Sequence, residues 1–494
     1  MSHWIKKYRT EIIFVCLILL FASFLRFYRL PEYMAFLGDE GRDALVIKEM
    51  LVEHNLPFIG PPTSVGNIYL GPLYYYMIAV PMAFFWLNPV AAAGMVAGIG
   101  VATVFLIYYL ARQWFGVLPA AFSAILYAVS PVTIIYSRSS WNPNPAPFFA
   151  LLTILGIYKA HKNKNYKWLT LSGAALAAAI QMHYLAMILI PVFLILWIIE
   201  LKATKGERNN FFLGTVMSVF AFFLIMLPLI LFDLKHNFLN FRAISTLFTE
   251  SQGALGFGIF NSISKVFPIY IQNLVGRYLS AEILLISLIL GILILFPFAM
   301  LKRKGVDIWP YKALAVWLLV GLLGLSFYKH DLYDHYLGFL SPVPFLLLGA
   351  SLNLIKKRWR YIAVPILLLV IGVINFQRNP LLSPPNNQLT RTQEIAKYVI
   401  GQSEGKPFNF ALIAKSNYDS AYRFYLDQYG ARPEVLSEVI TDQLFVVCED
   451  PVCNPIGHPK YEIAAFGWAK IERESEVLGV KVYKLVSNPG GKPL

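Results

Sequence analysis

Long runs of apolar residues recur along the first three quarters of the chain, separated by short polar segments. A helix needs about 20 apolar residues to cross a hydrocarbon core of about 30 Å, and the shorter runs can borrow length from neutral flanks. The pattern therefore predicts a polytopic α-helical membrane protein with about eleven transmembrane helices. The predicted spans are 12–25, 90–110, 118–136, 145–158, 168–181, 186–199, 211–232, 281–301, 311–327, 336–355 and 361–376.

The pattern changes after residue 376, where prolines and asparagines make a linker over 377–388. Amphipathic and strand-like stretches alternate beyond it. We therefore expect a membrane domain over 1–376 and a small α/β domain over 389–494, within the usual size of a domain. The tail is expected to form helices near 394–400 and 420–430 and strands near 408–414, 443–449 and 477–486.

Composition supports the membrane assignment and explains the net charge. Hydrophobic residues make up 57% of the chain and charged residues 14%, against roughly a quarter charged in soluble domains. The net charge of +14 does not indicate nucleic acid, because the cations gather in short loops between spans. Such loops stay cytoplasmic under the positive-inside rule. The clusters are Lys162, Lys164 and Lys167; Lys202, Lys205 and Arg208; Lys302, Arg303 and Lys304; and Lys356, Lys357, Arg358 and Arg360.

These clusters fix the direction of each crossing. The first run follows a basic start and ends in Arg26 and Arg29, so it is typical of a signal anchor with a cytoplasmic N-terminus. The cluster at Lys162 is then cytoplasmic only if an odd number of crossings precedes it. We therefore expect 73–87 to be a membrane-seated helix that does not cross, interrupted by Pro81. The alternative is an ordinary span with a weak cation signal at Lys162.

With that parity the polar segments that carry chemistry lie outside the cell, together with the tail. The first external segment covers 31–88, and further segments follow the third, fifth, seventh and ninth crossings. The cytoplasmic loops show no comparable grouping of Asp, Glu and His. We expect a reaction at the outer leaflet of the plasma membrane.

Asp39 and Glu40 are the best placed external carboxylate pair. A hydroxyl group becomes a useful nucleophile when a positioned carboxylate takes its proton during attack. Asp39 could instead only cap a helix over 40–52, and an acid at Glu40 suits a helix N-terminus for its dipole alone.

Cations at the outer ends of the helices could stabilise negative charge that develops on a leaving group. Lys329 and His330 are the strongest of these, although a pair of solvated loop charges would look the same. Arg138 could instead pair with Asp39 or extend to the headgroups. The substrate-binding or phosphate-binding candidates are Arg42, Arg138, His183, Tyr184, Lys329, His330, His335 and Tyr336.

Five segments carry a resemblance to a known family: RFYRLPE (26–32), Asp39-Glu40, Gly71 to Tyr74, ARQWFG (111–116) and KHDLYDHYLGFLSPVPF (329–345). Their order resembles that in the protein O-mannosyltransferase superfamily of GT-C glycosyltransferases, which includes the aminoarabinose transferases and RgtA-like enzymes. The resemblance covers about 10–380 in order and spacing. It implies inverting transfer of a sugar from a polyprenyl-phosphate donor to a protein, glycan or lipid-linked acceptor, with Asp39 as the base. This chain departs from the frequent His-Pro-Pro-Leu, with Leu70-Gly71-Pro72-Leu73 in its place.

Cysteine and metal chemistry add little to this interpretation. Cys448 and Cys453 could form a short-loop disulfide, and a metal site with His458 is a weak alternative. His330, Asp331, Asp334 and His335 are capable of ligation but match no strict metal template, so we expect no cofactor and keep a divalent metal at this segment as the weaker alternative.

Three further alternatives remain open. Trp141 could stack on a sugar ring, although an interface anchor is the more ordinary role. A lipid-linked sugar flippase or polymerase would share a basic phosphate cavity. A secondary transporter would need internal repeats and ionisable residues near helix midpoints, and neither is visible in the sequence.

Overall fold

The computed structural model describes residues 2–65, 68–204, 206–249, 259–488 and 490. Its internal contacts divide the chain into two compact units. The first unit consists of Met1–Tyr28, Leu56–Ile78 and Ala93–Pro384. The second consists of Arg29–Asn55, Ala79–Ala92 and Pro385–Leu494, so it combines the first polar segment with the C-terminal tail.

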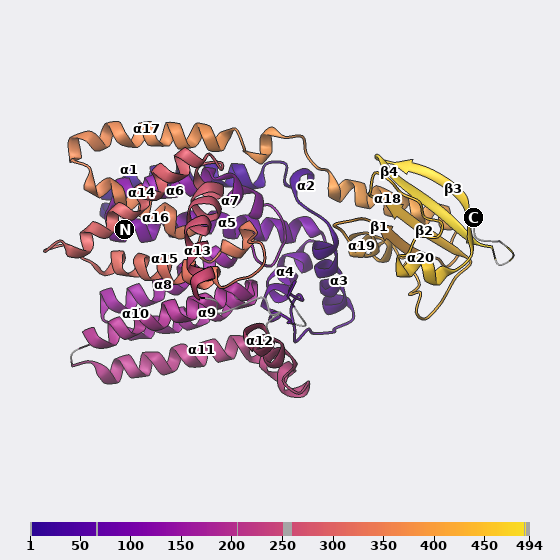
Figure 1. Cartoon of the computed structure of the whole chain (residues 1–494), viewed down its shortest axis with the longest axis horizontal. Helices are drawn as coiled ribbons and strands as arrows, with labels where there is room; N and C mark the ends of the chain where they lie inside the picture. Colours follow the sequence, from indigo (N-terminus) through magenta and orange to yellow (C-terminus); the bar gives the residue numbers. More distant parts are fainter. Residues whose placement is uncertain (1, 66–67, 205, 250–258, 489, 491–494) are drawn as a thin grey trace. The chain divides into compact units, whose positions relative to one another are not determined.

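The first unit is a bundle of helices whose positions follow the predicted spans (Figure 1). Seven helical segments of the described chain are long and apolar enough to cross a membrane, by length and composition, and three shorter apolar helices accompany them. The other predicted spans are helical too, but they are shorter, more polar or interrupted, as at Ser130 before Pro131. The helices are α1 (Ser2–Phe27), α4 (Leu73–Phe84), α5 (Pro89–Phe115), α6 (Val117–Val129), α7 (Pro131–Tyr136), α8 (Ala146–Asn163), α9 (Leu169–Met182), α10 (Leu189–Ala203), α11 (Arg208–Lys235), α12 (Leu239–Thr249), α13 (Ile259–Pro268), α14 (Leu284–Leu295), α15 (Trp309–Ser326), α16 (Pro342–Ser351) and α17 (Lys357–Phe376).

Small residues bring the bundle helices into close contact. Helices α8, α9 and α11 pack side by side. A Cβ added at Gly156 would overlap the Ser172 hydroxyl, and one added at Gly173 would overlap the Ser218 main chain. Such contacts between small residues are the usual means by which helices approach each other in a membrane, where burying apolar surface supplies little drive.

Ion pairs and hydrogen bonds fix the direction of the first two long helices. Glu11, early in α1, accepts hydrogen bonds from Arg112 Nε (2.7 Å) and from the Tyr108 hydroxyl (2.8 Å), both late in α5. Helices α1 and α5 therefore run antiparallel, so α4, which lies between them in the sequence, does not reverse the direction of the chain. With 12 residues, α4 is also only about 18 Å long, too short for a hydrocarbon core. This arrangement agrees with the non-crossing helix expected over 73–87.

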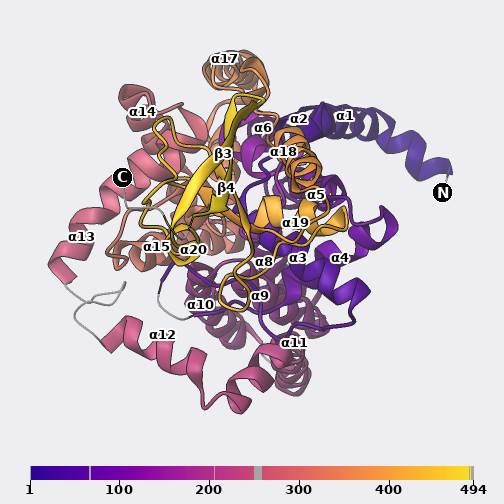
Figure 2. The ribbon, with the colours of Figure 1, turned by 90° about the vertical axis from the view of Figure 1, so that its right-hand side faces the viewer.

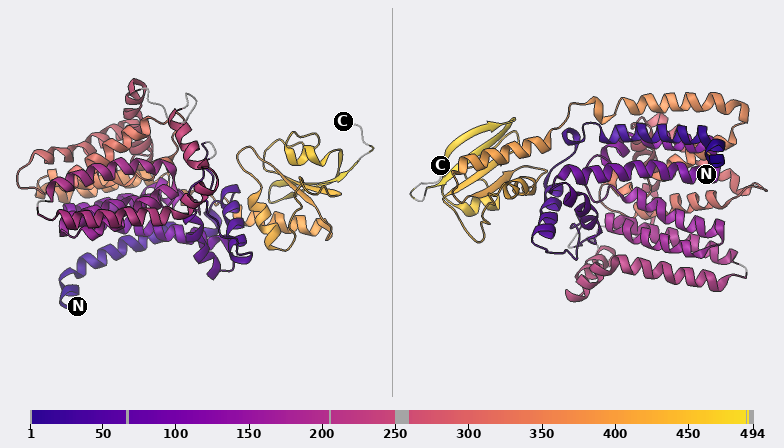
Figure 3. Two further views of the ribbon diagram at one scale, coloured as in Figure 1. Left: turned by 90° about the horizontal axis from the view of Figure 1, so that it is seen from below. Right: turned by 180° about the vertical axis from the view of Figure 1, so that it is seen from behind.

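The lysine-rich and arginine-rich loops gather at one end of the bundle. Figure 1 and the right-hand view of Figure 3 show the connections α10–α11, α14–α15 and α16–α17 at the same end as the start of α1. This is the arrangement that the positive-inside rule predicts for cytoplasmic loops.

The C-terminal part of the second unit is a four-stranded sheet with three helices. The strand order is β1-β2-β4-β3, with β1 and β2 parallel and the other pairs antiparallel. Strands β1 and β2 are buried along their whole length, which explains their uninterrupted apolar sequences. Figure 2 shows the long β3–β4 hairpin with α18 beside it. The elements are α18 (Gln388–Ser403), β1 (Asn409–Ile413), α19 (Ser420–Gln428), β2 (Gln443–Cys448), α20 (Tyr461–Phe466), β3 (Ala469–Val477) and β4 (Val480–Ser487).

Cys448 at the end of β2 forms a disulfide with Cys453, as their close spacing indicates. The bond closes a short loop that begins with Glu449.

The second unit also includes two helices from the first polar segment, α2 (Leu30–Tyr33) and α3 (Gly38–Val52). The sequence interpretation assigned this segment to the membrane domain. In the structure α3 packs against α19, and the Phe36 ring lies 6.1 Å from the Phe424 ring and 5.5 Å from the Tyr425 ring. Helix α3 therefore shares a core with the C-terminal domain.

Candidate active site

A cavity of about 530 Å³ lies against the loop after α15 in the first unit. Its volume falls within the range of about 300 to 1,000 Å³ that is usual for small-molecule sites. Lys329, His330 and Asp331 are exposed at this loop, whereas Tyr336 is buried. The lining residues are Ser64, Val65, Tyr328, Lys329, His330, Asp331, Tyr333 and Tyr336.

Hydroxyl groups and rings order the wall of this cavity. The Tyr184 hydroxyl donates to the Tyr328 hydroxyl (3.0 Å), and the Tyr336 hydroxyl lies 3.2 Å from Ser64 Oγ. The His183 ring lies 4.8 Å from the Tyr336 ring and 5.7 Å from the His335 ring. The structure thus brings His183, Tyr184, His335 and Tyr336 together, although 151 or more residues separate the two pairs in the sequence.

The cations of this region have different surroundings. Lys265, on α13, donates to the Tyr328 carbonyl (3.1 Å) and adds a positive charge that the sequence interpretation missed. Arg277 donates to Asp334 (2.9 Å) and to the Leu332 carbonyl (3.1 Å). The Arg277 pair neutralises Asp334, so Lys329, His330 and Lys265 are the cations best suited to a phosphate.

His183 differs from these cations. It is buried, and this burial lowers its pKa well below the ordinary value, an effect to which His335 adds. The ring is therefore neutral at physiological pH, and its Nδ1 accepts a hydrogen bond from Leu185 N (3.3 Å). A neutral His183 can orient a hydroxyl group but cannot neutralise a phosphate.

Arg138 is buried and engaged with the main chain. Its guanidinium donates to the Leu25 carbonyl (2.8 Å) and to the Tyr28 carbonyl (2.7 Å), at the end of α1. Arg26 likewise donates to the Ala22 and Ala128 carbonyls, each at 3.2 Å. Both arginines satisfy carbonyl groups at helix ends, which water cannot reach inside a membrane protein. This placement favours a structural role for Arg138 over the phosphate-binding role that the sequence suggested.

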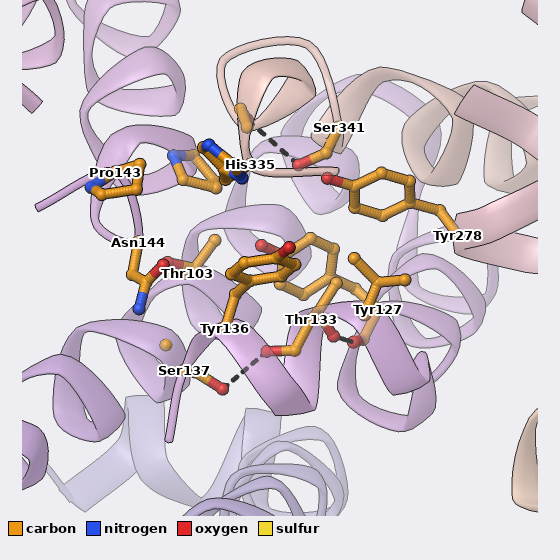
Figure 4. A pocket seen from close by; sticks show the side chains of 14 residues that line it. Thr103, Tyr127, Thr133, Tyr136, Ser137, Pro143, Asn144, Tyr278, His335 and Ser341 are labelled. Atoms are coloured by element: carbon orange, nitrogen blue, oxygen red, sulfur yellow. Dashed lines mark hydrogen bonds between the residues drawn. The ribbon is translucent and has the colours of Figure 1, made fainter. Parts of the chain in front are cut away.

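A second cavity in the first unit is small and rich in hydroxyl groups. Figure 4 shows Thr103, Tyr136, Ser137, Tyr278 and Ser341 around it, with His335 at one wall. Its volume of about 30 Å³ suits one or two water molecules and excludes a sugar ring.

Trp141 packs near this wall, with its ring 4.4 Å from the His335 ring. This contact orients His335, and whether Trp141 also stacks on a sugar remains a prediction.

Asp39 lies in the first turn of α3, in the second unit, with 39% of its side chain exposed. Its Oδ1 accepts hydrogen bonds from Arg42 Nη1 (2.8 Å) and from the Tyr418 hydroxyl (2.6 Å). No described residue donates a hydrogen bond to Asp39 Oδ2. Asp39 thus combines one anchored oxygen with one that is available to a substrate.

Glu40 has a different environment from its neighbour. It is 9% exposed, and its Oε2 accepts a hydrogen bond from Leu37 N (3.0 Å). Burial, with a smaller contribution from the carboxylates of Asp39 and Asp43, raises the pKa of Glu40 to about 7 against the lowering effect of the main-chain hydrogen bonds. Glu40 therefore stabilises the start of α3 rather than facing an acceptor.

The helix cap that the sequence offered as the alternative role for Asp39 is wrong. Helix α3 begins at Gly38, so Asp39 is already inside it, and Glu40 binds the free main-chain N–H of Leu37.

Arg42 is also not simply a free cation. It bridges Asp39 and the buried Asp43, at 2.8 Å and 2.7 Å. Its charge is largely used within α3, which weakens the case for phosphate binding by Arg42.

No group of three or more His, Cys, Asp or Glu side chains suited to a metal ion occurs among the residues that the structure describes. In the segment that the sequence offered as a metal alternative, Asp334 is paired with Arg277.

Comparison with known proteins identifies similar folds along almost the entire chain. The chain matches the crystal structure of ArnT from Cupriavidus metallidurans bound to undecaprenyl phosphate with a TM-score of 0.64 and 15% identity, over 97% of this chain and 98% of that chain. It also matches the oligosaccharyltransferase AglB from Archaeoglobus fulgidus, in complex with an inhibitory peptide and a dolichol-phosphate. That match has a TM-score of 0.54 and 15% identity, over 87% of this chain and 64% of that chain.

Two sequence matches point the same way. The family model described as dolichyl-phosphate-mannose-protein mannosyltransferase matches residues 70–232. The candidate mannosyltransferase YycA of Bacillus subtilis (strain 168) is 26% identical over 110 residues, which are 22% of this chain and 16% of that relative's length. These matches confirm the resemblance to GT-C glycosyltransferases, and with it the helical membrane fold with a small C-terminal sheet domain.

Proposed function

We propose that this chain, a membrane protein with the GT-C fold, transfers a sugar from a polyprenyl-phosphate donor to a hydroxyl acceptor on a protein, a glycan or a lipid-linked glycan. The observation that carries the proposal is the Asp39 carboxylate, with Oδ1 anchored by two donors and Oδ2 available. The similarity to a structure bound to undecaprenyl phosphate supports a lipid-phosphate donor.

The proposed step is a single displacement. The acceptor oxygen forms a bond to the anomeric carbon while its proton passes to Asp39 Oδ2. The bond between the anomeric carbon and the phosphate oxygen breaks, and its electron pair leaves with the polyprenyl phosphate. Water then takes the proton from Asp39, and the anomeric configuration of the sugar is inverted.

The cations at the 530 Å³ cavity are proposed to stabilise the departing phosphate. Lys329 and His330 line the cavity, and Lys265 contacts the main chain of the same loop. Positive charges placed beside the departing phosphate stabilise the negative charge that develops on it. Tyr184, His335 and Tyr336 are proposed to orient the sugar.

The proposed location is the plasma membrane, with the N-terminus and the basic loops cytoplasmic and the C-terminal domain outside. Single cysteines placed in the loop 302–304 and in the tail of intact cells test this orientation. An impermeant thiol reagent should label the tail only, and labelling of the tail only after permeabilisation would contradict the proposal.

The principal alternative is a flippase or polymerase of lipid-linked sugars, because it would also need a basic phosphate cavity. Purified protein incubated with a labelled polyprenyl-phosphate sugar and an acceptor separates the two functions. A transferase releases free polyprenyl phosphate in proportion to the glycosylated product. Movement of intact donor across a vesicle membrane, without release of polyprenyl phosphate, would contradict the proposal.

A further inference from the structure

The first turn of α3 is held by the segment that precedes α19 in the C-terminal domain. Gly38 N donates to Asn417 Oδ1 (2.8 Å), and Asn417 Nδ2 donates to Glu449 Oε2 (2.9 Å). Glu449 directly follows β2 and also accepts a hydrogen bond from the Tyr422 hydroxyl (2.6 Å). The start of α3 is thus tied through two side chains to the end of a buried strand.

Two glycines make this contact unusually close. A Cβ added at Gly38 would overlap the ring of Tyr418, and one added at Gly41 would overlap the main chain of Ala421. Neither glycine has a positive φ, so the backbone itself would accept any residue. The absence of a side chain therefore serves the close approach of α3 to the segment around α19.

This approach brings the Tyr418 hydroxyl to the carboxylate of Asp39. The hydroxyl donates to Asp39 Oδ1 (2.6 Å), the oxygen that also accepts from Arg42 Nη1 (2.8 Å). Burial raises the pKa of Tyr418 above its ordinary value, so the hydroxyl keeps its proton and remains a donor. Two donors on one oxygen fix the plane of the carboxylate and the direction of the other oxygen.

We propose that Tyr418 is a positioning residue that aims Asp39 Oδ2 at the acceptor hydroxyl, an inference that rests on the base role proposed for Asp39. Proton transfer depends steeply on geometry, because the donor and acceptor atoms must come within hydrogen-bond reach in the transition state. The C-terminal domain thereby takes part in the reaction through Tyr418, although it contributes no reacting group.

The variant Tyr418→Phe tests this role, because it keeps the ring that packs on Gly38 and removes only the hydroxyl. Losing one hydrogen bond to a charged group should lower kcat roughly tenfold to a hundredfold, with the donor KM and the melting temperature unchanged. The matched control is Tyr398→Phe, which removes a tyrosine hydroxyl that donates to Ser475 (2.5 Å) elsewhere in the same domain. We expect wild-type kcat from that control.

A second variant leaves Tyr418 itself intact. Gly38→Ala should push the Tyr418 ring away from Asp39 and lower kcat in the same way, so the proposal stays testable if Tyr418→Phe does not fold. Wild-type kcat in both variants would overturn the proposal. A fall in kcat matched by a rise in donor KM and a lower melting temperature would also overturn it, because Tyr418 would then be a packing residue.

Asp39→Asn distinguishes failure of this inference from failure of the proposed function. If Asp39→Asn is inactive while Tyr418→Phe and Gly38→Ala are fully active, only the positioning role is wrong. If Asp39→Asn is itself active, the base role on which the inference rests is wrong.

Discussion

The two regions that the sequence marked as chemical, the start of α3 and the loop after α15, are built in different ways. Asp39 takes one partner from its own helix, Arg42, and another, Tyr418, from 379 residues away. Lys329 instead belongs to an exposed loop whose cavity is lined mostly by its immediate neighbours. A general acid or base must be oriented toward the proton that it transfers, so its side chain needs fixed hydrogen-bond partners. A cation that stabilises a phosphate acts over a range of distances and directions.

This contrast predicts the largest loss of activity at the oriented carboxylate. Asp39→Asn preserves shape and can still accept the hydrogen bonds at Oδ1, but it removes the basic oxygen. Turnover of a labelled polyprenyl-phosphate donor should fall roughly a hundredfold to ten-thousandfold, the usual contribution of a general base. Donor binding, measured separately, should be retained.

Glu40→Gln is the comparison for that variant, because Glu40 is adjacent in sequence but buried as a helix cap. It should cost much less activity than Asp39→Asn. Near wild-type turnover in Asp39→Asn would remove Asp39 from the mechanism and leave Asp43, Asp331 and Asp334 as the next external carboxylates to test.

The loop region should respond more moderately. Lys329→Ala should reduce donor turnover roughly tenfold to a thousandfold, because one charge of a phosphate-stabilising group is lost while Lys265 and His330 remain. Lys304→Ala, in the exposed basic loop between α14 and α15, is the control and should leave turnover unchanged. An unchanged rate in Lys329→Ala, with normal membrane insertion, would make Lys329 a solvated loop charge.

The smallest expected effect is a dependence of the free energy of unfolding on pH, caused by the protonation of Glu40. A Glu40 side chain ordinarily loses its proton near pH 4.5, but in the folded protein it keeps the proton until about pH 7. Between pH 4.5 and 7 the folded state therefore binds more protons than the unfolded state. The free energy of unfolding falls as the pH rises through this range, by about 3 kcal/mol at most. Melting curves between pH 4.5 and 8 measure this slope.

Glu40→Gln should flatten the slope, because glutamine is neutral at every pH. Glu53 is an exposed residue directly after the same helix. The control variant Glu53→Gln should therefore have the same dependence of stability on pH as the wild type. Parallel pH dependences for wild type and Glu40→Gln would show that Glu40 does not titrate as described.

Most of the fold could be predicted from sequence, because the membrane imposes a strong local rule. Apolar runs of the right length become helices, and every predicted span is largely helical, although only seven helical segments of the described chain are long and apolar enough to cross a membrane. Helices α12 and α13 were not predicted. Charge parity favours a non-crossing helix at α4, and the short length of α4 in the structure is consistent with it. Strands β1 and β2 could be predicted as well, because buried parallel strands have continuous apolar sequences. Strand β3 was missed, because its charged and exposed sequence lacks that signal, and the strand expected near 477–486 covers the turn before β4 as well as β4 itself.

The partners of the charged residues could not be predicted, because they depend on contacts distant in sequence. Nothing near Asp39 in the sequence indicates Tyr418, and only the glycines Gly38 and Gly41 hint that another segment approaches. Arg138 looked like a phosphate ligand because a cation at a helix end can serve either an anion or unsatisfied carbonyls, and here it serves the carbonyls of α1. Lys265 was missed because its segment is neither a clear span nor a polar loop.

The anomeric configuration of the product, compared with that of the donor by proton NMR, tests the central claim most directly. The claim is that Asp39 acts as a base in a single displacement and never bonds to the sugar. A donor of defined anomeric configuration and a simple acceptor are sufficient for the measurement. The account predicts a product of inverted configuration. Retention of configuration would contradict it, because retention requires two displacements through a covalent intermediate, and a carboxylate such as Asp39 would then be the nucleophile.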